Sequence, residues 1–149
     1  DESNNNLIQN LEYEINIEKN NNYKLSSKTS EIFYKDGIEL IKMLEVKAIF
    51  TDKNNTKVIV TSDEAVYNNN NYNTIFKKNI EIRYLNNVIY GDILNLDLEN
   101  NNLKLYGNVK YDGINGNLTA DNIELDLISK QINIFMNQID QKVIINSKN

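Results

Sequence analysis

The sequence predicts an all-β fold built from short antiparallel strands. Three observations indicate it: apolar and polar residues alternate with a period of two, clusters of Asn and Gly separate the alternating segments, and one pattern recurs every 29 residues. The 149-residue length suits a single domain, and the 9 Tyr and many Ile favour strands over helices. Many short strands at regular spacing are typical of a sandwich, a jellyroll or a barrel.

The alternation is clearest in the second half of the chain. Residues 80–84 read IEIRY, residues 94–99 read LNLDLE and residues 123–127 read IELDL, and the shorter segments 103–105 and 109–111 behave alike. Such a pattern predicts a strand with one buried and one solvated face. Residues 38–46 also allow a helix, but their flanks favour a strand pair or a bent strand.

Turn-forming residues stand between these segments. Asn occupies positions 68–71, 86–87 and 100–102, and the dipeptides Asp112-Gly113 and Asn115-Gly116 follow. Asn tolerates the left-handed backbone conformation of turns, and Gly adopts it freely. We expect one domain over residues 1–149, with a flexible lead-in over 1–10 and a flexible tail over 141–149.

A shift of 29 residues aligns three units without gaps. A small residue falls at positions 62, 91 and 120, Asp at 63, 92 and 121, and Asn at 79, 108 and 137. Each unit predicts two strands and a turn that cannot bury their apolar face alone, so neighbouring units must stack. The small residue predicts a tight packing point, with a bulge at Gly91, and the Asp is expected to bond nearby backbone in a turn.

The repeat assigns one apolar face to the interior of the stack. The inward candidates are Val60, Ala65, Tyr67, Phe76, Ile80, Ile82, Ile89, Leu94, Leu96, Leu98, Leu103, Leu105, Val109, Tyr111, Leu118, Ile123, Leu125, Leu127, Ile132 and Ile134. All except Ala65, Tyr111 and Ile132 are also our candidate lipid-binding residues. They form either an ordinary packed core or an apolar slot for acyl chains, and the sequence leaves both open.

Composition argues against several function classes. His and Cys are absent, which removes the commonest general base and the thiol nucleophile. The net charge of -5 disfavours binding to nucleic acid or to anionic membrane surfaces. The carboxylate pairs Asp97 with Glu99 and Glu124 with Asp126 fit a solvated strand face. We therefore expect no enzyme activity, no metal and no cofactor.

Several motifs resemble the LptC family of lipopolysaccharide export proteins and its periplasmic relatives. The stretch YKLSSKTSEIF at 23–33 is similar to the opening strand of that family. The stretches TSDEAVY at 61–67 and TADNIELD at 119–126 resemble its A-D-x-a-x-y-d strands, and LYGNV at 105–109 resembles its L-x-G-N-V strand. The resemblance covers roughly residues 11–136. With the repeat, it implies an open β-jellyroll, a twisted solenoid-like stack of short antiparallel strands.

The same resemblance implies a function. It implies a periplasmic protein of a Gram-negative cell, held at the inner membrane by an N-terminal anchor absent from this chain. Lipopolysaccharide acyl chains would lie in the apolar groove. Strand edges would pair with an LptB/LptF/LptG-like transporter at one end and an LptA-like bridge protein at the other, because an open sheet edge accepts a further strand. Lipid would pass from the transporter to the bridge.

Three alternatives stay open. An LptA-like bridge role shares the repeats, although the block YEINI at 13–17, a polar turn and YKL at 23–25 resemble the LptC lead-in. A structural or adhesive β-solenoid would use the repeat for shape and hold no lipid. A carbohydrate-active β-helix enzyme would need carboxylates or aromatics clustered on one exposed face.

Overall fold

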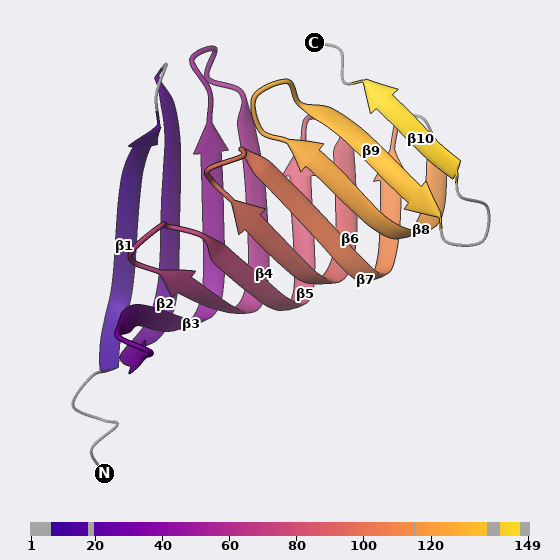
Figure 1. Ribbon diagram of the computed structural model, residues 1–149. Coiled ribbons are helices and arrows are strands. Elements are labelled where there is room, and N and C mark those ends of the chain that lie inside the picture. Colours follow the sequence, from indigo (N-terminus) through magenta and orange to yellow (C-terminus); the bar gives the residue numbers. More distant parts are fainter. Residues whose placement is uncertain (1–6, 18–19, 115, 137–140, 147–149) are drawn as a thin grey trace.

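The computed structural model describes residues 7–17, 20–114, 116–136 and 141–146. They form one antiparallel sheet whose ten strands follow sequence order, which confirms the all-β stack (Figure 1). The strands are β1 (Leu7–Ile17), β2 (Asn21–Lys35), β3 (Ile38–Thr51), β4 (Lys57–Asn68), β5 (Thr74–Tyr84), β6 (Asn87–Asp97), β7 (Asn102–Gly113), β8 (Gly116–Asp126), β9 (Gln131–Met136) and β10 (Gln141–Asn146). No helix in these ranges is long and apolar enough to cross a membrane.

The sheet bends back on itself along a line of bulges. The register between neighbours shifts at Thr61/Glu64, Lys77/Ile80, Tyr90/Ile93 and Tyr106/Val109. A bulge adds a residue on one strand and sharpens the local twist. Because the bulges are in register, the middle strands bend together along the lower edge of Figure 1 and place one half in each of two layers.

We name the two layers by the turns at their free ends. The rear layer of Figure 1 ends in the turns at 52–56 and 85–86, and the front layer ends in the turns at 69–73, 98–101 and 127–130. The gap between these two sets of turns, on the side away from the bend, is called the mouth below.

The bulges also change the phase of the alternation. On β6, Ile89 and Gly91 face the interior, and after the bulge Leu94 and Leu96 face it as well. A strict period of two would put the second pair in solvent. The repeated small residue is needed here, since a Cβ on Gly91 would lie 2.5 Å from Leu105 Cδ1. The register shift between Tyr90 and Ile93 is the bulge that was predicted at Gly91. The missing side chain at Gly91 leaves room for Leu105 beside the bend.

Two boundary expectations are corrected by backbone pairing. Residues 7–10, expected to be part of a flexible lead-in, belong to β1, where Leu7 to Gln9 pair with Glu31 to Thr29 of β2. Residues 141–146, expected in a flexible tail, form β10 against β9. Residues 1–6 and 147–149 lie outside the described residues. Residues 38–46 are the bent strand that was one of the two expectations, with Glu45 left-handed at φ 54°.

Candidate functional site: the interior and mouth of the folded sheet

The structure brings the predicted inward residues together in one apolar core between the layers. All the candidate lipid-binding residues except Leu98 and Leu118 are buried, and those two are partly buried against the same core. The core also contains residues that the repeat did not reach, from β2 and β3: Tyr23, Leu25, Ile41, Met43, Val46, Ala48 and Phe50. The sequence signal for these two strands was the alternation at residues 23–25, where Tyr and Leu stand on either side of a lysine.

The interior is filled in this conformation. Val60, Phe76 and Leu94 each have 0% of their surface exposed. Close packing leaves no room for an acyl chain between such side chains unless the layers move apart. The mouth is the side on which they can separate, because the bend joins them on the other side.

Aromatic side chains bridge the mouth near β1. Tyr13 of β1, in the rear layer, stacks on Tyr67 of β4, in the front layer, with ring centroids 4.6 Å apart. Next to it, the Tyr23 hydroxyl lies 3.0 Å from Thr74 Oγ1 at the start of β5, and both residues are buried. Burial raises the pKa of the Tyr23 phenol far above its ordinary value, so this group stays protonated. Among the described residues, the backbone hydrogen bonds of the turns at the mouth stay within one layer, so these side-chain contacts join the two layers there.

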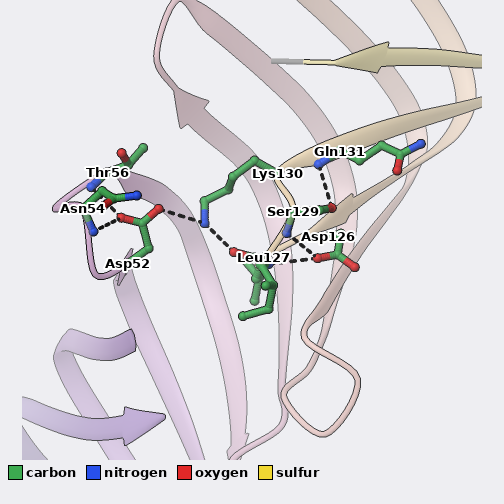
Figure 2. Close-up of polar contacts among 9 residues, drawn as sticks. Asp52, Asn54, Thr56, Asp126, Leu127, Ser129, Lys130 and Gln131 are labelled. Carbon is green, nitrogen blue, oxygen red and sulfur yellow. Dashed lines mark hydrogen bonds and ion pairs between the residues drawn. The ribbon is translucent and has the colours of Figure 1, made fainter. Parts of the chain in front are cut away.

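An ion pair bridges the mouth further along. Lys130, from the turn after β8, places its Nζ 3.5 Å from Asp52 Oδ2, in the turn after β3 (Figure 2). The same Nζ donates a hydrogen bond to the Leu127 carbonyl oxygen. Only 8% of Lys130 is exposed, which is unusual for a lysine. We call this pair the clasp.

Backbone hydrogen bonds hold the acidic half of the clasp. The N–H groups of Asn54 and Thr56 both donate to Asp52 Oδ1 at 2.9 Å. Burial alone would raise the pKa of Asp52, but these two hydrogen bonds and the Lys130 ammonium outweigh it and hold that pKa below its ordinary range. Asp52 is therefore an anion at neutral pH.

The basic half is positioned by a second aspartate. Asp126 Oδ1 accepts hydrogen bonds from the N–H groups of Ile128 at 2.9 Å and Ser129 at 2.8 Å, which shapes the turn before Lys130 (Figure 2). Lys130 itself is left-handed at φ 62°. Asp126 was predicted to lie on a solvated strand face, and it serves as a turn-capping group at the end of its strand.

A hollow of about 340 Å³ adjoins the clasp at the mouth. Ile17, Asn21 and residues 52–54 line it from the rear layer, and Asn101 and Ile128 from the front layer. Ile128 is 54% exposed, so an apolar side chain stands in the opening. Sequence reasoning missed the clasp, because neither of its residues lies in an alternating segment. The only signal was the Asp-x-Asn-x-Thr turn at 52–56.

Two of the three repeated Asp residues, Asp63 and Asp92, do not act as expected. Asp63 Oδ2 accepts a hydrogen bond from Asn79 Nδ2 at 2.6 Å, and Asp92 Oδ2 accepts one from Asn108 Nδ2 at 2.8 Å. The predicted bond to backbone in a turn is thus replaced by a bond to a side chain on the next strand. The cause is the bulge, where Asn79 and Asn108 are left-handed at φ 53° and 49°. The third Asn, Asn137, lies outside the described residues.

The described residues include no group of three or more Asp, Glu, His or Cys side chains placed to hold a metal ion. No protein-family model matches the chain, and no curated protein matches it. Any function must therefore be argued from the geometry. Its main features are an apolar interior, a mouth closed by a few cross-layer contacts, and β1 and β10 at the two edges of the sheet.

Proposed function

We propose that the chain binds the acyl chains of a lipid, lipopolysaccharide, between its two layers and passes the lipid on without chemical change. The observation that supports this most is the construction of the interior. Aliphatic and aromatic side chains fill the space between two layers that are continuous at the bend and joined at the mouth by few contacts. The layers can then separate at the mouth without loss of strand pairing.

The energetics favour such an exchange. Moving a methylene from water into an apolar site contributes about 0.8 kcal/mol, so one acyl chain offsets the loss of several cross-layer contacts. In the opened state, acyl chains would replace the contacts that side chains of opposite layers now make with each other. The negative head group would stay outside the mouth, in keeping with the net charge of -5.

The two sheet edges supply the partners in this proposal. Within the described residues, β1 pairs only with β2, and β10 only with β9. Strand addition at one edge would join an LptB/LptF/LptG-like transporter, and at the other an LptA-like bridge protein. The chain would work in the periplasm, anchored to the inner membrane, as the LptC family does. A role as an LptA-like bridge protein would use the same two edges, because β1 and β10 each pair with only one strand within the described residues.

Photocrosslinking tests the proposed path of the lipid. A benzoylphenylalanine in place of Leu98, which is inward and partly buried, should crosslink to lipopolysaccharide. The matched control replaces Ile75, which is 43% exposed and therefore faces away from the interior. Leu96→Asp or Leu125→Asp, added to the Leu98 probe, should abolish the adduct. Equal crosslinking at both probe positions, or unchanged crosslinking in a folded Leu96→Asp protein, would contradict the proposal.

A structural β-solenoid is the second candidate, and the filled interior favours it. If the packing between the layers is permanent, the repeat serves only to build shape, and the protein holds no lipid. Purified protein that carries no lipid and takes none up would support this candidate.

A further inference from the structure

We propose that the outer face of the bend carries a binding groove for a neutral, linear saccharide. The groove is separate from the interior, and the proposal does not depend on lipid binding. It rests on a hollow over the middle strands, on an exposed tyrosine at its centre and on oriented amide and carboxylate groups along it.

The groove crosses four strands at the bend. A hollow of about 540 Å³ is lined by residues 79–81 of β5, 90–92 of β6, and Asn108 and Lys110 of β7. A second hollow of about 340 Å³ shares Tyr90 and Lys110 with the first and extends over residues 117–119 of β8. The two hollows adjoin at Tyr90 and Lys110, and together they are called the groove below.

Tyr90 provides the platform. Its side chain is 38% exposed, and the strand register places Glu81 and Lys110 on either side of it. The face of an aromatic ring is electron-rich, so it attracts the C–H groups on the flat face of a pyranose. The flanking carboxylate and ammonium can then bond the ring hydroxyls, which both donate and accept.

The cross-strand amide pairs give the groove its periodicity. In both Asn79–Asp63 and Asn108–Asp92, the amide oxygen and the second carboxylate oxygen make no hydrogen bond within the described residues. Asn79, Asn108 and Asp92 line the groove, so their oxygens remain available to a ligand, while the existing bond fixes each amide. Asp63 lies outside the lining and only holds Asn79 in place. The pairs lie two strands apart, about 9.5 Å at the usual strand spacing. A chain of linked sugars presents equivalent hydroxyls at a similar interval.

Charge along the groove limits the ligand class. The carboxylates of Glu81, Asp92 and Asp112 outnumber the ammonium of Lys110, which disfavours an anionic glycan. A neutral saccharide meets no such repulsion, and the exposed ring of Tyr90 offers it an apolar contact.

The test is an NMR titration of the ¹⁵N-labelled protein with cellohexaose and with a hexamer of N-acetylglucosamine. At least one should shift the backbone amides of residues 79–81, 90–92 and 108–110 saturably, with a dissociation constant on the order of 1 mM. A heparin hexasaccharide should not. Tyr90→Ala should weaken binding about tenfold or more, while Tyr90→Phe keeps the ring and binds nearly as well. Tyr34→Ala is the matched control, since Tyr34 is 69% exposed on β2.

Several results would overturn the proposal. They are no saturable shift with either neutral hexamer, a response to the sulfated sugar alone, or undiminished binding by a folded Tyr90→Ala protein. If both sugars fail to bind and peptides selected from a library do bind the groove, the groove belongs to a protein partner instead. The ligands contain no lipid, so none of these outcomes bears on acyl-chain binding.

Discussion

Lys130 Nζ lies 3.5 Å from Asp52 Oδ2, and the two residues come from turns at opposite sides of the mouth. Four other ion pairs in the described part of the chain, Lys24–Glu12, Lys28–Glu45, Lys78–Glu64 and Arg83–Glu81, link adjacent strands or lie within one. Those pairs are largely exposed and contribute little to stability. The clasp instead joins the two layers, so it bears on how easily the mouth opens.

Removing the lysine of the clasp should weaken the closed state. Lys130→Met keeps the length of the side chain and leaves Asp52 without its counter-ion. We expect the free energy of unfolding to fall by about 1–2 kcal/mol, because the pair is mostly buried. Lipopolysaccharide uptake should also become faster. Urea denaturation and a time course of uptake measure the two effects. Lys104→Met, on the exposed face of β7, should leave both unchanged, and an identical effect of the two substitutions would argue against the clasp.

The clasp should also make stability depend on acid pH. The pKa of Asp52 is lower in the folded protein than its ordinary value of 3.8. Its contribution to stability is therefore complete above pH 3.8 and is lost as pH falls through the lower folded pKa. The difference in unfolding free energy between the native protein and Asp52→Asn should be constant at neutral pH and shrink below pH 4. Asp36→Asn, in an exposed turn, is the control; a difference that grows on acidification would refute the assignment.

The small residue at the bend should be intolerant of added volume. A Cβ on Gly91 would lie 2.5 Å from Leu105 Cδ1 and 2.6 Å from its Cγ. Gly91→Ala should therefore destabilise the fold by about 1–3 kcal/mol. Leu105→Val removes atoms from the same space, so the double variant should cost less than the sum of the two single changes. Strictly additive free energies, measured by urea denaturation, would show that the two residues do not press on each other.

A further prediction concerns the asparagines of the bend that have a left-handed backbone conformation. Asn108 has φ 49° and donates to Asp92. Asn108→Gly and Asn108→Ala both lose this hydrogen bond, but only Ala carries the steric cost of the left-handed conformation. The Ala variant should be less stable than the Gly variant by about 1 kcal/mol in thermal or urea unfolding. Equal stability would mean that the backbone relaxes away from this conformation.

Much of the fold could be predicted from the sequence, because one face of nearly every strand is buried. The alternation identified the inward residues, and the 29-residue shift matched the hairpins β4–β5, β6–β7 and β8–β9. The bend was harder to predict. Segments 103–105 and 109–111 looked like separate short strands, yet they are two halves of β7. The left-handed Gly107 and Asn108 between them change the phase of the pattern without ending the strand.

The mouth could not be predicted for a different reason. Asp52 pairs with Lys130 only because the bend brings together turns that five strands separate along the chain. No periodic pattern encodes such a contact. The groove around Tyr90 likewise combines residues of four strands, β5 to β8, that are separate in the sequence. The sequence predicted where side chains are buried, and the geometry of the bend determines where the two layers meet.

The proposed lipid binding requires that the layers separate at the mouth and take up acyl chains. Native mass spectrometry of the detergent-free protein, mixed with purified lipopolysaccharide and, in parallel, with a simple fatty acid as control, tests it most directly. We expect a stoichiometric lipopolysaccharide adduct that Leu96→Asp abolishes in a folded protein. The absence of any adduct in a folded sample would contradict lipid uptake and leave the inward residues as the ordinary core of a structural β-solenoid.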